Sequence, residues 1–157
     1  FLSETNESAL SSGMARIRAV DRRLFLLIEI AARRLNREAD KRLKAEAGVS
    51  AAQAGVLFLL LRRGQRRMGS LSKTLSLNPP AVTGLVDRMV RAGLVTKTTD
   101  QTDGRGAMVA LTAEGSEAAE RADIVLRDLN ADLEARLGDE VSDILHDAFT
   151  RIVIAES

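Results

Sequence analysis

Basic and small polar side chains that can bind nucleic acid gather in one short stretch of this 157-residue chain, LNPPAVTGLVDRMVRAG, from Leu77 to Gly93. Thr83, Gly84 and Arg88 fall between apolar residues that recur at helical spacing. A hydroxyl and a guanidinium on the solvent-exposed face of such a helix can reach bases or phosphates in the major groove of DNA. The alternative is an ordinary solvated helix, so the rest of the chain has to decide.

The boundaries of this helix are marked in the sequence. Asn78 can cap its first turn, Pro79 suits that turn, and Gly93 ends it. Since Asn78 precedes a proline, it is disfavoured from helical geometry, and the chain must turn before this helix begins. The apolar side that we expect to be buried carries Val82, Leu85, Val86, Met89 and Val90.

The sequence offers little to an enzyme or to a metal site. With no Cys, it can form neither disulfides nor thiolate zinc sites, and with one His, His146, it cannot form a histidine-rich centre. We interpret His146 as a surface or interface residue, although Asp143 and Asp147 lie within helical reach of it. No nucleophile–base pair, glycine-rich phosphate loop or carboxylate dyad is evident. We therefore predict no catalysis, no cofactor and no metal.

The chain also lacks the marks of a membrane or secreted protein. Its longest apolar run, Val56 to Leu61, is far shorter than the ~20 residues of a membrane span. Residues 1–13 are polar and Ser-rich, without the order of a signal peptide, so we expect a loose tail. The predicted location is the cytoplasm, with no membrane partner. Phe1 is not Met, which is consistent with further residues upstream.

The net charge of +1 conceals a strong asymmetry. Met14 to Ala47 holds ten Lys or Arg against five Asp or Glu, and Arg62 to Gly106 holds nine against three. From Ala107 to Ser157 the balance reverses to four against twelve. A basic middle with an acidic end suits a protein that presents one side to a polyanion. Scatter of charge over solvated helix faces is the alternative.

Helices precede this stretch. Apolar residues at three-and-four spacing from Met14 to Leu43 predict one long helix. Ser50 and Gln53 form a capping box, with Val49 as a hydrophobic staple, for a second, mostly apolar helix that stops at Gly64. A third, short helix is expected from Gly69 to Ser76. With Leu77 to Ala92 it makes a helix-turn-helix.

An extended segment and two further helices follow. The β-branched run from Leu94 to Thr99 predicts a strand, and Met108 to Leu111 can return as its partner, with Asp103-Gly104 at the turn. Thr112 can cap a fifth helix that ends at Gly138. Asp139 can cap a sixth helix. The predicted fold is mainly α with a small β-hairpin.

The residues from Gly64 to Gly115 resemble the MarR family of winged helix-turn-helix transcription regulators. The motifs that carry this resemblance are PPAVTGLVDRMVRAGLV, the DGR at 103–105 and the ALTAEG at 110–115. The resemblance implies a homodimer held together by the first, fifth and sixth helices. Its implied organisation is a tail at 1–13, dimerisation helices at 14–47 and 113–157, and a DNA-binding lobe at 48–112. Two departures are Ser70-Leu71-Ser72 in place of Glu-Leu-Ala, and Lys97 in place of Arg.

The candidate DNA-binding residues follow from both readings. Thr83 and Gly84 can approach bases, with packing as the alternative for Gly84; Pro79 and Pro80 can touch thymine methyls or only start the helix. Arg88 can bind a base or a phosphate, or pair with Asp87 or Asp103. Arg105 can enter the minor groove, steadied by Asp103 as the resemblance implies, or be solvated. Together the candidates are Lys73, Asn78, Pro79, Pro80, Thr83, Gly84, Arg88, Lys97, Asp103 and Arg105, with the arginines from Arg62 to Arg67 as further phosphate contacts.

These observations predict a dimeric, sequence-specific repressor that inserts Leu77 to Ala92 of each chain into successive major grooves of a pseudo-palindrome. The resemblance further implies release by a small, often aromatic acid, which we treat as a hypothesis. Two rivals remain. A non-specific architectural protein would bind any duplex with a steep salt dependence, and a protein-interaction module on the same fold would not bind DNA.

Overall fold

The computed structural model describes residues 23–99 and 106–154. Contacts between Cα atoms group residues 39–157 into one unit and the preceding residues into another, and the two are described separately. Helix α2 (Leu24–Glu46) begins in the first unit and ends in the second. Residues 14–22 of the long helix expected from the sequence, and the tail before them, lie outside the described part.

In the second unit, helix α3 (Ala51–Arg63) supplies the centre of the core. The predicted capping box is confirmed, since Ser50 Oγ accepts a hydrogen bond from the Gln53 amide and Gln53 Oε1 accepts one from the Ser50 amide. Gly64 ends the helix as predicted, at a positive φ of 71° that favours glycine. Ala54, Val56, Leu57 and Leu60 are all buried along it.

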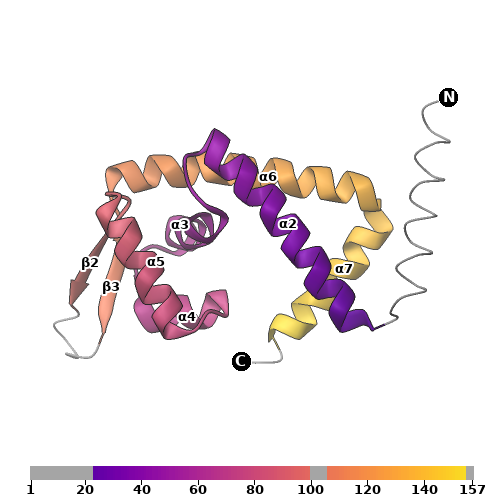
Figure 1. The fold of residues 1–157 in the computed structure, drawn as a ribbon, viewed down its shortest axis with the longest axis horizontal. Helices are drawn as coiled ribbons and strands as arrows, with labels where there is room; N and C mark the ends of the chain where they lie inside the picture. The colour runs from indigo at the N-terminus through magenta and orange to yellow at the C-terminus, as the bar shows by residue number, and fades with distance from the viewer. Residues whose placement is uncertain (1–22, 100–105, 155–157) are drawn as a thin grey trace. The chain divides into compact units, whose positions relative to one another are not determined.

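The helix-turn-helix is confirmed as α4 (Met68–Leu75) and α5 (Pro79–Arg91). Helix α4 begins and ends one residue earlier than the expected Gly69 to Ser76, and α5 is shorter at both ends than the expected Leu77 to Ala92. Leu71 of α4 and four residues of α5 point into the same core as α3, so three helices enclose one apolar cluster. Figure 1 places α3, α4 and α5 on one side of the long helix α6 (Ala113–Leu137).

Strands β2 (Val95–Thr99) and β3 (Ala107–Leu111) form the predicted antiparallel hairpin, which we call the wing. The sequence analysis missed a third strand. Arg66 and Arg67 form β1, which pairs antiparallel with β3 through Arg66 opposite Val109 and Arg67 opposite Met108. The sheet therefore has the order β1-β3-β2, with β3 in the middle. The hairpin turn, Asp103-Gly104, lies outside the described residues.

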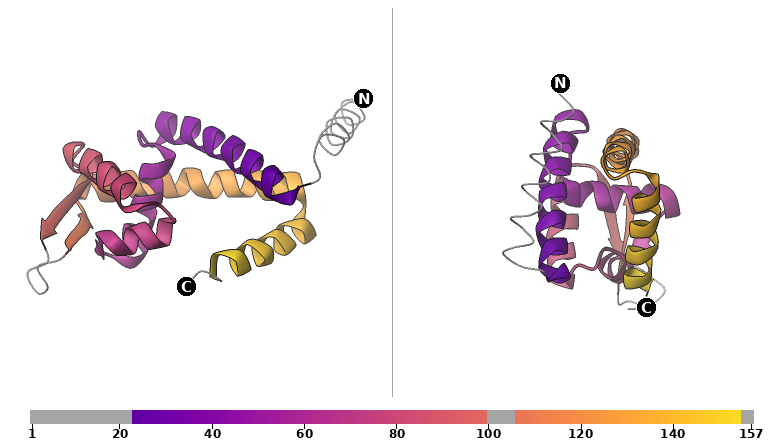
Figure 2. Two further views of the ribbon diagram at one scale, coloured as in Figure 1. Left: turned by 60° about the horizontal axis from the view of Figure 1, so that its bottom comes forward. Right: turned by 90° about the vertical axis from the view of Figure 1, so that its right-hand side faces the viewer.

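Helix α6 packs on α3 and runs as one long helix in Figure 2. Thr112 caps it as predicted by accepting a hydrogen bond from the Gly115 amide. All of its buried residues lie between Gly115 and Val125. Arg42, near the end of α2, ties that helix to α6 with its Nη1 atom 3.1 Å from Asp132 Oδ2.

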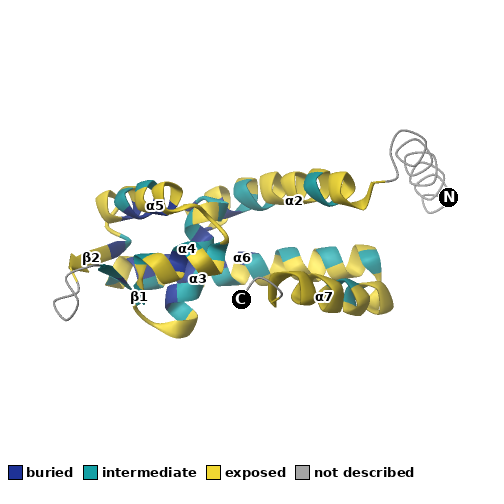
Figure 3. Ribbon diagram, turned by 90° about the horizontal axis from the view of Figure 1, so that it is seen from below, coloured by how far each residue is buried: buried dark blue, intermediate teal, exposed yellow. Residues whose placement is uncertain are grey.

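Helix α7 (Asp139–Ile154) has no buried residue, and Figure 3 shows the contrast with the buried cluster around α3, α4 and α5. Its expected cap is a correction to the sequence analysis. The Gly138 carbonyl accepts the hydrogen bonds of the Ser142 amide and hydroxyl, so Asp139 lies inside the first turn. An acidic residue there still stabilises the helix dipole.

Candidate nucleic-acid interface

The residues at the start of α5 fix where this helix begins. Asn78 Oδ1 accepts a hydrogen bond from the Ala81 amide at 2.9 Å, and Pro79 and Pro80 occupy the first helical positions. The predicted cap is therefore confirmed. Just before it, Ser76 holds a left-handed conformation, with φ 50°, that lets the chain reverse between α4 and α5. Ser72 Oγ donates a hydrogen bond to the Leu77 carbonyl and fastens this turn.

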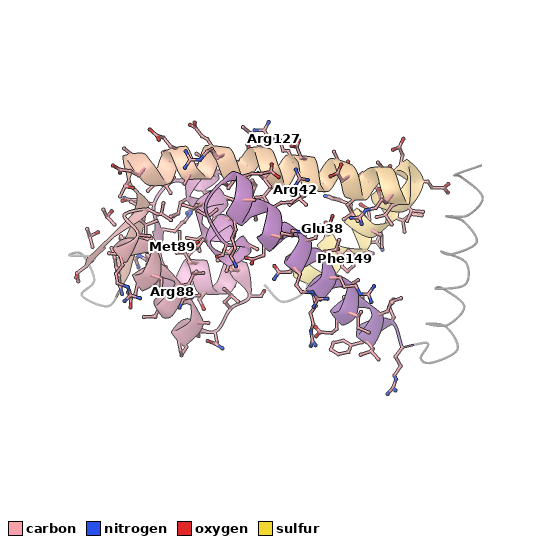
Figure 4. The ribbon with its side chains drawn as sticks, turned by 45° about the horizontal axis from the view of Figure 1, so that its top comes forward. Glu38, Arg42, Arg88, Met89, Arg127 and Phe149 are labelled. Carbon is pink, nitrogen blue, oxygen red and sulfur yellow. The ribbon has the colours of Figure 1, made fainter. Side chains whose placement is uncertain are left out.

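Helix α5 divides cleanly into two sides. Val82, Leu85, Val86 and Met89 are buried, while Arg88, next to Met89 in the sequence, is exposed (both are labelled in Figure 4). Val90, which the spacing also assigned to the apolar side, is 39% exposed. At 100° per residue the centre of the exposed side follows Pro80, Gly84 and Arg91. Thr83 and Asp87 flank that line on one side, and Ala81 and Arg88 on the other.

Gly84 gives Arg88 room to lie along the helix. A Cβ atom placed on Gly84 would stand 3.6 Å from Arg88 Nη1, which is ordinary van der Waals contact. The guanidinium therefore lies over the flat patch that Gly84 leaves. Arg88 forms no ion pair with any residue in the described ranges 23–99 and 106–154. Of the two partners considered for it, Asp87 binds Lys97 instead, and Asp103 lies outside the described residues.

Lys97, on β2, was expected to contact phosphate. Its Nζ atom lies 3.0 Å from Asp87 Oδ1, so its charge is already engaged by the side of α5. Both side chains remain partly exposed, at 33% and 44% of their areas. The salt bridge fixes the wing against α5.

The hydroxyl of Thr83 is also engaged. Its Oγ1 atom donates a hydrogen bond to the Pro79 carbonyl at 3.0 Å, one turn earlier in the helix. Such a bond leaves oxygen lone pairs free to accept, whereas donation to DNA requires the hydroxyl to rotate. Lys73 is exposed near the end of α4. Asp103 and Arg105 lie outside the described residues, and their assignment stays a prediction.

Sequence reasoning missed a pocket of about 480 Å³ between α3 and α6. Its walls combine an aromatic ring with guanidinium groups. The Arg62 guanidinium lies 5.6 Å from the centre of the Phe58 ring, and Arg127, labelled in Figure 4, pairs with Asp123. The sequence signal for this pocket is the spacing of Phe58 and Arg62, which are one helical turn apart.

The pKa values of Asp40 and Arg42 are shifted by contacts that stabilise the fold and not by a catalytic environment. A hydrogen bond from Lys44, together with one from the Ala51 amide, lowers the pKa of Asp40 below its usual value of 3.8. Glu46 raises the pKa of Arg42 by accepting its hydrogen bond. Among the described residues, no group of three or more His, Cys, Asp or Glu residues is placed to hold a metal ion.

No described helix is by itself long and apolar enough to cross a membrane. The helices α2 and α3 reach that length and composition only when joined across the bend between them. Much of α3 is buried in the protein core, as expected of a core helix.

Residues 47–106 match the MarR family, and no curated protein matches the sequence. Wild-type apo MarR from E. coli is 27% identical, covers 83% of this chain and 96% of its own, and has a TM-score of 0.67. The S. aureus MepR–DNA complex is 18% identical, with 86% and 99% covered and a TM-score of 0.76.

NadR in complex with 4-hydroxyphenylacetate is 22% identical, with 85% and 94% covered and a TM-score of 0.69. The two structures below 25% identity support the fold. The family match spans the helix-turn-helix and the first strand of the wing, and the likeness to these solved structures covers 83–86% of the chain. Residues 47–106 therefore match the MarR family, a family of transcription regulators rather than enzymes, and the fold of the described residues is similar to that of solved MarR-family proteins.

Proposed function

We propose that this protein is a sequence-specific DNA-binding repressor that acts as a homodimer. The observation that carries the proposal is the exposed side of α5, where Pro80 and Gly84 leave a flat surface and Arg88 and Arg91 are exposed at its end. A helix with such a surface fits the major groove. Likeness to a family member solved with DNA supports the same role.

The DNA contacts would come from several elements. In the proposal, base contacts come from Thr83, Gly84 and Arg88, and contacts to the DNA backbone come from Lys73 and Asn78 to Pro80. Arg105, held in place by Asp103, enters the neighbouring minor groove. Lys97 contacts a phosphate to the extent that its salt bridge with Asp87 permits. We retain the division into a DNA-binding lobe at 48–112 and dimerisation helices at 14–47 and 113–157. A DNA-bound role also implies the cytoplasm.

Selection from a random duplex library at physiological salt tests this function. The proposal expects an enriched inverted repeat whose half-site centres lie about one helical turn, ~34–36 Å, apart. Arg88→Ala and Arg105→Ala should each weaken binding to the selected site by about 1–3 kcal/mol. Arg121→Ala, an exposed position on α6, serves as the control and should leave binding unchanged.

Other results would point elsewhere. Retention of all duplexes without enrichment, with a steep salt dependence, would identify an architectural DNA-binding protein. If no duplex is retained, the DNA role is wrong and a protein partner becomes the better hypothesis.

The homodimer is supported by apolar side chains that the helices outside the DNA-binding lobe leave exposed. On α7, Ile144, Ile152 and Val153 are at least 59% exposed, and on α2, Phe25 is 77% exposed. Exposed apolar surface of this extent usually belongs to an interface. Light scattering should give twice the chain mass. Ile144→Glu should produce monomers, whereas Glu140→Gln, on the same helix, should not.

For the effector, we propose a small aromatic acid bound in the pocket of Phe58, Arg62 and Arg127. The ring can stack on an aromatic ligand and Arg62 can pair with its carboxylate, while Arg127 is paired with Asp123. A structural relative holds 4-hydroxyphenylacetate. Calorimetric titration with a panel of phenolic acids should detect binding that Arg62→Gln weakens. If no acid binds, effector control is wrong, while the DNA role is unaffected.

A further inference from the structure

A second, smaller pocket lies where α3, β1 and α4 meet. Its volume is about 80 Å³, and its walls are Leu59, Arg63, Arg66, Ser70, Leu71 and Thr74. No carboxylate is among these walls. The pocket is separate from the one at Phe58, with which it shares no residue.

The two arginines of this pocket are held by regular structure. Arg63 is the last residue of α3, and Gly64 ends the helix directly after it. Arg66 is anchored by the backbone pairing of β1 with Val109 of β3. Neither arginine forms a salt bridge with another residue in the ranges that the structure describes. Their charges therefore converge on the pocket without an acidic partner there.

Two hydroxyl groups complete the set of donors. Ser70 and Thr74 are one turn apart on α4, so their side chains lie on the same side of that helix. Helical Ser and Thr often donate to the carbonyl four residues earlier, as Thr83 and Ser142 do here. Within the described chain, Ser70 and Thr74 make no such bond. Both hydroxyls are free to donate into the pocket.

The geometry points to a binding site for a phosphate group. Two guanidinium groups and two hydroxyls supply more donors than the two oxygens of a carboxylate require, whereas a tetrahedral oxyanion can accept them all. The volume corresponds to a few water molecules at roughly 30 Å³ each, which is the size of one such group. Leu59 and the buried Leu71 form an apolar floor that strengthens charge interactions above it.

The phosphate can belong to a free anion or to the backbone of bound DNA, and the site is defined by the chemistry that the two share. The inference does not depend on the proposed function, because the first measurement contains no DNA. In that measurement, inorganic phosphate is titrated into the full-length ¹⁵N-labelled protein at constant pH and ionic strength, with chloride as the replaced anion.

Saturable shifts of the Ser70 and Thr74 backbone amide signals are expected with phosphate and not with chloride. Arg63→Gln and Arg66→Gln should each raise the apparent Kd by roughly tenfold or more, as expected for loss of a charge-assisted hydrogen bond. Arg121→Gln is the control, because Arg121 is exposed on α6 and lines neither pocket, so this substitution should leave the Kd unchanged. If Arg66→Gln disturbs β1, Arg63→Gln and Ser70→Ala still test the site in a folded protein.

A second titration with a short duplex of arbitrary sequence distinguishes the sources. Shifts of the same amides with the duplex but not with inorganic phosphate, lost in Arg63→Gln, would identify the anion as DNA backbone phosphate. Shifts with inorganic phosphate would establish a free-anion site whether or not DNA binds. If neither titration shifts these amides, or if the variants match the wild type in both, the inference is wrong.

Discussion

The Nζ atom of Lys97 lies 3.0 Å from Oδ1 of Asp87, so a salt bridge joins strand β2 of the wing to the flank of helix α5. These two elements carry the proposed major-groove and minor-groove contacts. Their relative position decides whether both can reach one DNA site. The salt bridge therefore serves alignment as well as stability.

We predict a small stability effect and a larger effect on DNA binding from breaking this pair. A partly exposed ion pair contributes about 0.2–1 kcal/mol, so a double-mutant cycle of Asp87→Asn and Lys97→Gln in urea should give a coupling energy in that range. Binding to the selected operator should fall further in Lys97→Gln than in Arg121→Ala. Equal operator binding by wild type and Lys97→Gln would refute the alignment role.

Gly115 should tolerate no side chain. A Cβ atom there would lie 1.8 Å from the Leu94 carbonyl oxygen, which also accepts the hydrogen bond of the Thr112 amide. Because the obstacle is backbone, relief requires α6 to move away from the wing. Gly115→Ala should lower the free energy of unfolding by about 1–3 kcal/mol, the usual cost of overpacking.

The matched control for that substitution is Gly69→Ala in α4, where a Cβ atom meets nothing within 4 Å. Since alanine is the better helix former, Gly69→Ala should stabilise the protein by about 0.5–1 kcal/mol. Urea denaturation of both variants measures the contrast. Equal effects of the two substitutions would contradict the close approach of Gly115 to Leu94.

Ser76 stores backbone strain in the turn between α4 and α5. Its φ of 50° lies in the left-handed region, which L-residues other than Gly adopt at a cost of roughly 1–2 kcal/mol. Ser76→Gly should remove part of this cost and raise the midpoint of thermal unfolding. Ser76→Val should lower it, because a β-branched residue is poorly tolerated at positive φ. A rise with valine would show that the turn is not strained.

Asp40 should make the stability of the second unit depend on acid pH. Lys44 and the Ala51 amide lower the pKa of this carboxyl in the folded protein, so its ionised form stabilises the fold. The contribution is fully present above the ordinary pKa of 3.8 and is lost as the pH falls through the lower folded value.

Denaturant unfolding between pH 2 and pH 6, analysed for each variant, measures this dependence. Asp40→Asn should be less stable than wild type at pH 6, and the difference should shrink as the pH falls. Lys44→Gln should reproduce part of the change, because Lys44 is the main cause of the lowered pKa. A constant difference between wild type and Asp40→Asn across this range would exclude the linkage.

Much of the fold could be predicted because short-range signals set the element boundaries. Ser50, Asn78 and Thr112 each accept a hydrogen bond from a backbone amide three residues later, which depends only on local sequence. The apolar side of α5 follows from periodicity, and the two strands of the wing follow from the β-branched run and the turn residues between them. The resemblance to the MarR family could also be recognised from the motifs of this central region, and residues 47–106 match that family.

Other features depend on residues that are distant in the sequence. Strand β1 has two residues, too few for a periodic signal, and exists only because β3 offers a free edge. Lys97 reaches Asp87 because the wing folds back along α5. The pocket of Arg63, Arg66, Ser70 and Thr74 forms because three elements meet around it.

The sequence by itself therefore determined the helices, the hairpin, the absence of cysteine chemistry and the family resemblance, since these rest on residue type and local spacing. Only the tertiary structure decided which charges are engaged and which remain available. Lys97 is committed to Asp87, whereas Arg63 and Arg66 meet two hydroxyls and no carboxylate. Electrostatic partners depend on distance in space, which spacing along the chain does not specify.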